Sequence, residues 1–436
     1  MTETTLPDAD RSPLRIANFR AYWFSRLSMT LAQYAMMLII GWQTYNIARD
    51  GGMGVGAASG QLALIGLLQF VPLFLLTPFS GWAADHFDRR NIARLTVLAQ
   101  LGCAATLAWL TTSNNLTLPT LFSVAVVLGI VRAFNGPALS ALAPNLVPKT
   151  ILPNAIALSS IAWQVGMIVG PAIGGYTYAI FPALPYCVAL GLFACSLVAL
   201  SFIGRVPQPP REANRRPIHQ MVEGLRYVVR NKMVLGAITL DLFAVFLAGA
   251  TALFPVYARD ILEVGETGLA QLAMAPAVGA ALTALWFSFR PLKTNVGPKM
   301  LLAVAVFGLA TIIFGLSQSM PLSLAMLFIV GAADMFSVYI RQSLIQLHTP
   351  DDKRGRVSSV SLLTISASNE FGDFFSGSLA FLLGPVLAVV GGGVGAIVTV
   401  ALWAKIFPVL RTTRTFDPPE ELLDTPPEQK LQEQMP

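Results

Sequence analysis

The sequence contains few charged residues, few cysteines and few histidines. Asp, Glu, Lys and Arg together make up 12% of its 436 residues, whereas soluble domains average about 25%. The three histidines are scattered in polar segments, and no spacing typical of a metal site or a disulfide framework occurs. We therefore expect no metal, no cofactor and no enzymatic activity. Three cysteines lie in apolar segments and are expected in the core: Cys103, Cys187 and Cys195.

The apolar segments lack the alternation of apolar and polar residues that marks the strands of a membrane β-barrel. They are continuous runs, and the chain is 55% hydrophobic with a mean hydropathy of +0.64. A helix needs about 20 residues to cross a hydrocarbon core about 30 Å thick. The length therefore fits about twelve helical spans joined by short loops. The predicted fold class is an all-α integral membrane protein.

A long polar segment, residues 205–232, divides the predicted spans into two sets of six. Within it, Ile218, Val222, Leu225 and Val229 recur at helical spacing. This spacing indicates an amphipathic helix lying on the membrane surface. The expected parts are a cytoplasmic tail at 1–17, a six-helix half at 18–204, the linker at 205–232, a second six-helix half at 233–408 and a disordered cytoplasmic tail at 409–436.

The basic residues are unevenly distributed along the chain. Of the 29 Lys and Arg, 24 fall on one side of the predicted membrane, two (Arg49 and Arg259) on the other side and three within spans. Cytoplasmic loops carry such an excess of positive charge, so both termini should be cytoplasmic. The net charge of +6 then faces the anionic inner leaflet and not a nucleic acid. We expect a monomer in a bacterial inner membrane.

One short polar turn, residues 81–94, connects two uncharged apolar runs. Its basic residues place it on the cytoplasmic side. Asp85 adds an acid that the distribution of positive charge does not require. The turn is therefore a candidate for a specific role beyond setting the topology, which is the alternative.

This turn resembles the loop between helices 2 and 3 of the major facilitator superfamily of transporters, which commonly reads G-x-x-x-D-[RK]-x-G-[RK]-[RK]. The matching residues are Gly81, Asp85, Arg89 and Arg90. His86 and Asp88 depart from the pattern. The resemblance implies that the loop latches the two halves in one access state, here by contacts with the start of span 11 near Arg356.

The two sets of spans also echo each other when the sequence is shifted by 202 residues. The polar stretch Pro148–Asn154 then falls on Pro350–Arg356. Two parallel halves related by an axis along the membrane normal are the arrangement of that superfamily. Four small residues of the first half fall on identical residues of the second: Gly129 on Gly331, Ser159 on Ser361, Gly170 on Gly372 and Gly175 on Gly377.

Two further elements extend the resemblance. The segment Gly129–Gly136, with Arg132, is similar to the R-x-x-x-G element that the family links to proton coupling. Span 5 carries a stretch similar to the G-P-x-x-G-G element of the exporters, for which plain helix packing is the alternative. Pro350–Arg356 with the Ser-rich span after it resembles a bacterial branch that includes siderophore exporters and macrolide efflux proteins. The residues of the span 5 element are Gly170, Pro171, Gly174 and Gly175.

Charged residues within spans cost at least about 2.5–3.5 kcal/mol each at mid-helix, so each requires a reason. The repeat superimposes Arg132 of span 4 on Asp334 of span 10. We expect these two to lie near each other across the central cavity in at least one access state. The alternative is that each is satisfied within its own half.

Carboxylates at depth occur only in the second half, so proton coupling is expected to use Asp241, Asp334, Glu370 or Asp373. Glu370 and Asp373 are three residues apart and share a helix face. Two close carboxylates raise the pKa of one of them, which suits a proton carrier. The alternative is that these two acids pair with Arg341 or line a wet vestibule.

Polar residues within spans are candidates for the wall of a substrate cavity: Gln33, Asn135 and Gln164. Their mixture with Met and Phe suits an amphipathic solute. Together with the resemblance to bacterial exporters, these residues imply a secondary transporter that exports an amphipathic small molecule, drug-like or siderophore-like, in exchange for protons. The alternatives are an importer of the same fold and, from another class, a membrane-bound lipid-handling protein.

Overall fold

The computed structural model describes residues 12–204 and 217–417, and within these ranges every regular element is a helix. The surroundings of Gly81 and the side chains of Asp85 and Glu370 lie outside the description. The helices of the first group are α1 (Ala17–Asp50), α2 (Val55–His86), α3 (Arg89–Thr112), α4 (Leu118–Leu142), α5 (Leu152–Ile180) and α6 (Leu184–Ser201). The linker helix is α7 (Pro217–Arg230), and the second group holds α8 (Lys232–Ala248), α9 (Phe254–Val256), α10 (Gly265–Phe289), α11 (Val296–Leu316), α12 (Met320–Leu347), α13 (Asp351–Leu383), α14 (Pro385–Ile406) and α15 (Pro408–Thr412).

The twelve predicted spans correspond to α1–α6, to α8 with its continuation, and to α10–α14 in the described ranges. The seventh span is broken, because α8 ends at Ala248 and the chain continues through short helical turns to Ile261. Ten of these helices are long and apolar enough to cross a membrane by themselves. The other two, α1 and α13, carry more polar residues. The prediction of an all-helical membrane fold of this type is confirmed.

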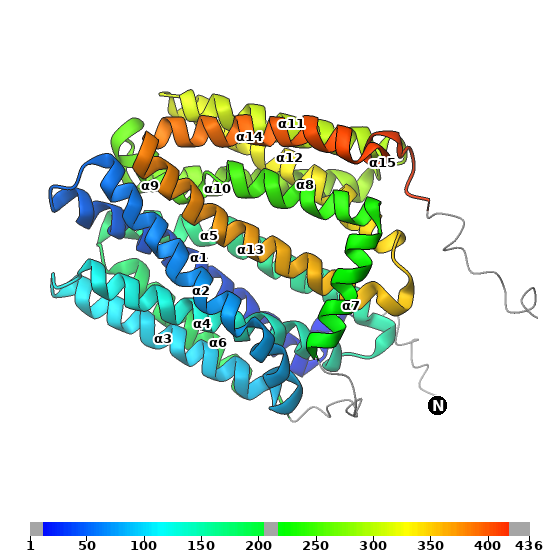
Figure 1. Cartoon of the computed structure of the whole chain (residues 1–436). Coiled ribbons are helices and arrows are strands. Elements are labelled where there is room, and N and C mark those ends of the chain that lie inside the picture. Colours follow the sequence, from blue (N-terminus) through cyan, green and yellow to red (C-terminus); the bar gives the residue numbers. More distant parts are fainter. Residues whose placement is uncertain (1–11, 205–216, 418–436) are drawn as a thin grey trace, which may run out of the picture.

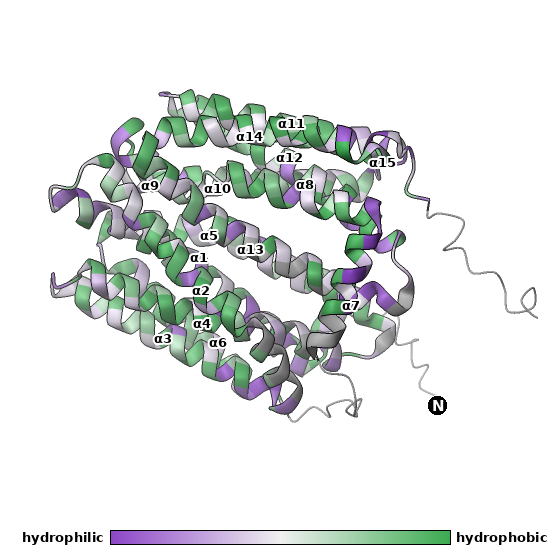
Figure 2. Cartoon of the chain, in the orientation of Figure 1, coloured by the Kyte–Doolittle hydropathy of each residue, from purple (hydrophilic) through white to green (hydrophobic). Residues whose placement is uncertain are grey.

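The long helices pack as two groups that meet along two pairs of helices (Figure 1). In the first group α1 packs on α5 and α6, and α2 packs on α4; in the second, α10 and α11 pack on α12, and α11 also packs on α14. The groups meet where α2 lies on α13 and where α5 lies on α10. Hydrophobic residues cover the middle of the long helices, and hydrophilic ones gather at their ends and on α7 (Figure 2). This distribution is typical of a protein whose solvent is a bilayer.

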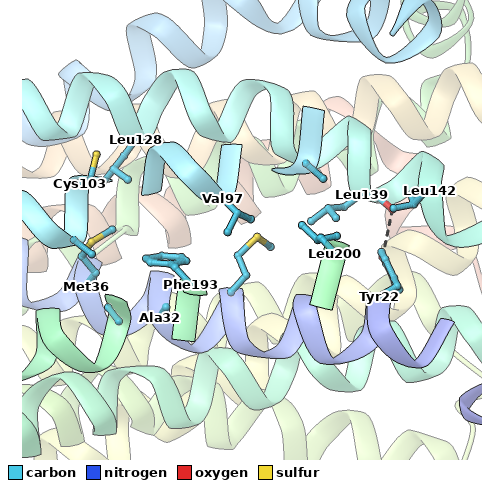
Figure 3. Close-up of a cluster of buried hydrophobic side chains, with 14 of the residues drawn as sticks. Tyr22, Ala32, Met36, Val97, Cys103, Leu128, Leu139, Leu142, Phe193 and Leu200 are labelled. Carbon is cyan, nitrogen blue, oxygen red and sulfur yellow. Dashed lines mark hydrogen bonds between the residues drawn. The ribbon is translucent and has the colours of Figure 1, made fainter. Parts of the chain in front are cut away.

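Each group has its own apolar core. In the first, side chains of α1, α3, α4 and α6 interdigitate, and the Tyr22 hydroxyl donates to the Leu139 carbonyl at 3.3 Å (Figure 3). Cys103 belongs to this core, whereas Cys187 and Cys195 are exposed on α6. The core prediction is therefore wrong for these two, because an apolar face of a membrane helix can point to lipid as well as to protein.

A third apolar cluster joins the two groups at one end of the bundle. We call this end, where α1 leads into α2 and which lies opposite α7, the distal end (Figure 1). The cluster combines Trp42 and Tyr45 of α1 with Leu62 of α2, Leu269 of α10 and Ala380 of α13. The distal end is thus closed by apolar contacts between the groups.

Glycines allow the two groups to approach closely near this end. A Cβ added at Gly175 of α5 would lie 2.6 Å from the Glu266 carbonyl oxygen of α10. One added at Gly377 of α13 would lie 2.9 Å from the Ala63 Cα of α2. Gly175 and Gly377 are also matched by the 202-residue shift. The repeat in the sequence therefore corresponds to equivalent helix crossings on the two sides of the bundle.

Two boundaries differ from expectation. The Gly-rich sequence of residues 49–60 is typical of a flexible loop, but residues 55–60 form the first turns of α2, where Gly56 and Gly60 lie against Phe381 of α13. The glycines serve close packing there and not flexibility. The tail expected to be disordered from 409 instead continues as α15, and the Gly297 amide donates to the Thr413 carbonyl at 3.1 Å.

Candidate functional site

The family motif runs from the last turns of α2 into the start of α3. The surroundings of Gly81 and the side chain of Asp85 fall outside the description. The Asp88 side chain caps α3 by accepting from the Arg90 amide at 3.0 Å. It also accepts from the Arg90 guanidinium, which holds the pKa of the Asp88 carboxyl below its usual range. Asp88 replaces the second motif glycine, so this departure has a structural use: it stabilises the start of α3.

The basic residues of the turn also tie α3 to the end of α6. The buried Arg90 guanidinium donates to the Ile203 carbonyl at 3.0 Å, and Arg94 donates to the Leu200 carbonyl at 2.9 Å. These contacts stay within the first group. Arg89, the remaining basic motif residue, is partly buried.

The start of α13, the expected partner of the latch, contacts the linker helix. Arg356 forms an ion pair with Glu223 of α7 at 2.6 Å, and a Cβ at Gly224 would lie 2.9 Å from the Arg356 carbonyl oxygen. On α7 the predicted apolar face is exposed: Val222, Leu225 and Val229 point away from the bundle. The linker helix therefore braces α13 with one face and offers an apolar face to its surroundings, as an interfacial helix would.

The C-terminal end of α12 joins the same assembly. The Tyr227 hydroxyl of α7 donates to the His348 carbonyl at 2.8 Å, and Lys353 lies 5.4 Å from the centre of the Tyr227 ring. The His348 side chain is buried. Burial lowers its pKa from the usual value near 6.5, and a hydrogen bond with the Leu344 carbonyl opposes this in part.

Two reciprocal ion pairs join the groups at the distal end. Arg49 of α1 binds Asp260 with its Nη2 and Nε atoms at 3.0 and 3.2 Å. Arg259 binds Asp50, the residue next to Arg49, at 2.6 Å. The Tyr45 hydroxyl also donates to Asp260. We call Arg49, Asp50, Arg259 and Asp260 the distal clasp.

The clasp is reached from solvent through a depression of about 380 Å³. A further hydrogen bond, from Gln271 to the Tyr176 hydroxyl at 3.2 Å, joins α10 and α5. The clasp, the hydrogen bond from Arg259 to the Asn46 side chain and the Gln271–Tyr176 hydrogen bond thus all join the two groups at the distal end. The distal end is therefore sealed by polar contacts as well as by the apolar cluster.

The clasp was not predicted from the sequence, although its residues carry a signal there. Arg49 and Arg259 are the only two basic residues assigned to the less basic side of the membrane. Each is followed by an aspartate, and each dipeptide stands at the end of the first span of its group. Two such dipeptides at equivalent positions of a repeat can form reciprocal pairs.

A buried charge cluster lies within the second group. Arg341 of α12 is 2% exposed and forms an ion pair with Asp241 of α8, which is 7% exposed. Asp334 stands two turns before Arg341 on α12 and lines the same small cavity as Asp241. Arg341 thus pairs with Asp241, a partner that the sequence did not predict. Asp373, one of the two acids expected to pair with Arg341 in the alternative above, accepts from the Thr251 hydroxyl at 2.9 Å.

The structure places Arg132 and Asp334 in different surroundings. The Arg132 Nη1 atom lies 3.4 Å from the Gln69 Oε1 atom of α2, within the first group. Asp334 lines the cavity of the second group. A direct pair across the centre stays a prediction for another access state.

The Gly-Pro element of α5 lies where α5 crosses α1. A Cβ at Gly170 would lie 2.6 Å from the Tyr34 Cβ, and one at Gly174 would lie 2.7 Å from the Ala35 carbonyl oxygen. Pro171 is buried between them. The element therefore packs helices closely, and Gly175 extends this packing to α10.

The candidate cavity residues differ in their placement. Asn135 is buried and hydrogen-bonded inside the first group, where it accepts from the Thr96 hydroxyl at 3.2 Å and contacts the Met29 sulfur. In this conformation it stabilises helix packing and does not line an open cavity. Gln33 of α1 and Gln164 of α5 are partly exposed and remain candidates.

Comparison with known proteins agrees with this architecture. Residues 9–434 match a family model described as transmembrane secretion effector. The multidrug efflux pump Tap of Mycolicibacterium fortuitum is 26% identical over 342 residues, which covers 76% of this chain and 79% of Tap. The enterobactin exporter EntS of Escherichia coli is 24% identical over 363 residues, which covers 82% of this chain and 85% of EntS.

Solved structures with the same fold include two transporters of low sequence identity. A bacterial homologue of the human lysosomal transporter Spinster, in an inward-facing and occupied conformation, superimposes with a TM-score of 0.67 at 16% identity, covering 92% of this chain and 99% of the other. A D-xylose–proton symporter gives a TM-score of 0.66 at 11% identity, with coverage of 92% and 99%. At these identities the likeness concerns the fold alone.

Proposed function

Because the chain belongs to the transmembrane secretion effector family of the major facilitator superfamily, we propose that it exports an amphipathic small molecule in exchange for protons. The exporter names of its relatives, Tap and EntS, support the direction and the class of substrate. The two bodies that move are the halves 18–204 and 233–408, which rock about a site at the middle of the membrane.

The observation that carries this proposal is the distal clasp. A seal made of ion pairs between the two helix groups can break and re-form as the groups move, unlike a continuous apolar core. The seal lies at the end opposite the basic linker helix, so we assign it to the outer side of the membrane. The structure then represents a state in which the outer path is closed.

The remaining assignments follow from this orientation. Both termini and α7 face the cytoplasm of a bacterial inner membrane, and the protein acts as a monomer without a cofactor or an enzymatic step. Gly81, Asp85, Arg89 and Arg90 hold the inner side shut in the opposite state by contacting the start of α13. In that state Arg356 exchanges Glu223 for the motif acid. Gln33 and Gln164 line the substrate path.

An accumulation assay in a bacterial host that lacks its own efflux pumps tests the proposal. Cells with and without the protein are loaded with dyes, macrolides and siderophores, with and without a protonophore. We expect lower accumulation of at least one compound, and the protonophore should abolish the difference. Equal accumulation of every compound would contradict the export of such molecules.

The same assay separates the proposal from its alternatives. Raised accumulation of any compound would identify an importer of the same fold. A change in membrane lipid composition without a change in accumulation would favour a lipid-handling protein.

A further inference from the structure

We propose that Asp241, Asp334 and Arg341 form the site that takes up the coupling proton, with Asp334 as the group that carries it. The inference rests on the proposed proton-driven export and assigns that step to one place in the molecule. The site lies inside the second helix group, between α8 and α12.

The geometry brings two acids to one base. Asp241 and Asp334 line a common cavity of about 10 Å³, with Ser337 between Asp334 and Arg341 on the same helix. A volume of this size is close to what one water molecule needs. Arg341 is engaged by Asp241, and among the described residues its Nε atom has no hydrogen-bond partner. The guanidinium therefore has a donor left for a second acceptor.

The charge of the cluster requires a proton. With both carboxylates ionised, the three residues carry a net charge of −1, and a charge at mid-span costs at least about 2.5–3.5 kcal/mol. The ion pair neutralises Asp241, so the uncompensated charge belongs to Asp334. One proton on a carboxylate oxygen of Asp334 makes the cluster neutral.

The surrounding helices supply no other cation at this depth. On the described parts of α10, α11 and α14 the charged residues are Glu266, Lys299 and Lys405, each near a helix end. On α13, Asp373 is engaged by Thr251, and the side chain of Glu370 is outside the description.

The described residues of α8 and of the first helix group also supply no other cation at the depth of Asp334. On α8, Lys232 begins the helix at its inner end. In the first group Arg132 is held near Gln69. Arg341, two turns along the same helix, is therefore the cation that Asp334 can share with Asp241.

The proposed step is a transfer of a proton without any covalent change in the substrate. Asp334 binds a proton when its cavity is open to the outer side. It releases the proton to the cytoplasm when the Arg341 guanidinium turns from Asp241 towards Asp334. The exchange of partners between α8 and α12 links protonation to movement of these helices.

Infrared spectroscopy of the full-length protein in liposomes tests the assignment without a substrate. The band of protonated carboxylic acids is followed as the pH is raised through neutrality. We expect one acid to lose its proton in the wild-type protein and this change to be missing in D334N. The control E266Q should titrate like the wild type. Identical titrations of the wild type and D334N, or loss of the change in D373N instead, would overturn the assignment.

A second experiment measures transport, with ethidium as the probe. In energised cells, D334N should slow ethidium efflux by about tenfold, within the usual range of coupling between two sites on one protein. Downhill ethidium release without an energy source should persist. If D334N expels ethidium against a gradient as fast as the wild type does, the proposal is refuted. If the wild type expels no ethidium, the proposed function fails for this compound, and the infrared titration still decides the assignment.

Discussion

His348 is a buried histidine at the inner end of α12, where its backbone carbonyl accepts from Tyr227 of the linker helix. Because burial lowers its pKa, the unfolded chain binds a proton at a higher pH than the folded protein does. Its contribution to stability is therefore complete above the usual pKa near 6.5 and is lost as the pH falls towards the folded value.

We expect the wild-type protein in detergent to melt at a lower temperature in mildly acidic buffer than at neutral pH. H348Q should reduce this difference, because the group that titrates is removed. H86Q, a change at an exposed histidine, serves as the control. An unchanged pH dependence in H348Q would show that His348 contributes nothing to it.

Sequence reasoning at this scale identified the charged residues within spans but not their partners. A charged side chain within a membrane span is energetically costly, so such residues can be recognised from the sequence alone. The pair of Asp241 with Arg341 could not be derived, because the two residues are 100 positions apart on different helices and several acids competed for the same base. Asp88 was noted only as a departure from the motif, although an aspartate before a helix is a common N-cap.

At the scale of helices, the crossings of α5 with α10 and of α2 with α13 depend on glycine. The atoms that a Cβ would meet at Gly175 and Gly377 are backbone atoms and alanine Cβ atoms, which are fixed to the backbone and cannot move away as a flexible side chain can. Overpacking of this kind typically costs about 1–3 kcal/mol.

We expect G175V and G377V to remain folded but to close the distal end poorly, with slower efflux of a transported compound. G191V provides a matched control, since Gly191 is exposed on α6 and nothing lies within 4 Å of its added Cβ. Efflux by G175V at the rate of G191V would mean that this crossing does not limit transport.

The positions of the helices were largely predictable from the sequence, whereas the roles of particular residues within them were less so. Continuous apolar runs indicated nearly all spans. The start of α2 was missed because glycine is a poor helix former in isolation, whereas here Gly56 and Gly60 are fixed by contact with α13. The Gly-Pro element of α5 was left between an element of the exporters and plain helix packing, and the structure shows that it packs closely against α1.

At the scale of the whole molecule, the distal clasp should set the balance between the two access states. The Arg49–Asp260 pair uses two hydrogen bonds between partly buried groups, and hydrogen bonds to charged groups contribute about 1.5–3 kcal/mol. In the other pair Asp50 is 68% exposed, and exposed pairs contribute about 0–1 kcal/mol. The first pair should therefore dominate the seal.

We expect R49D and D260R each to open the distal end and the double variant R49D/D260R to restore closure. The measurement is labelling of L38C by a membrane-impermeant maleimide from outside, in a background without the natural cysteines. Leu38 packs against the apolar cluster beneath the clasp. E263Q controls for a nearby change of charge outside the clasp. Equal labelling of all these variants would argue against a gate at this end.

The two-fold character of the molecule was predictable from the 202-residue repeat, because matched glycines occupy matched crossings. The access state could not be predicted. The access state depends on small differences in free energy between two sets of contacts, and the same residues can form either set.

The reciprocal layout of the clasp has an electrical consequence. Each helix group contributes one arginine and one neighbouring aspartate, so each side of the clasp is neutral when the two sides separate. A unit charge that crosses a potential of 100 mV changes the free energy by about 2.3 kcal/mol, but opening the clasp moves no net charge. In the proposed mechanism, the membrane voltage would therefore act on the proton of the buried cluster and not on the opening of the clasp.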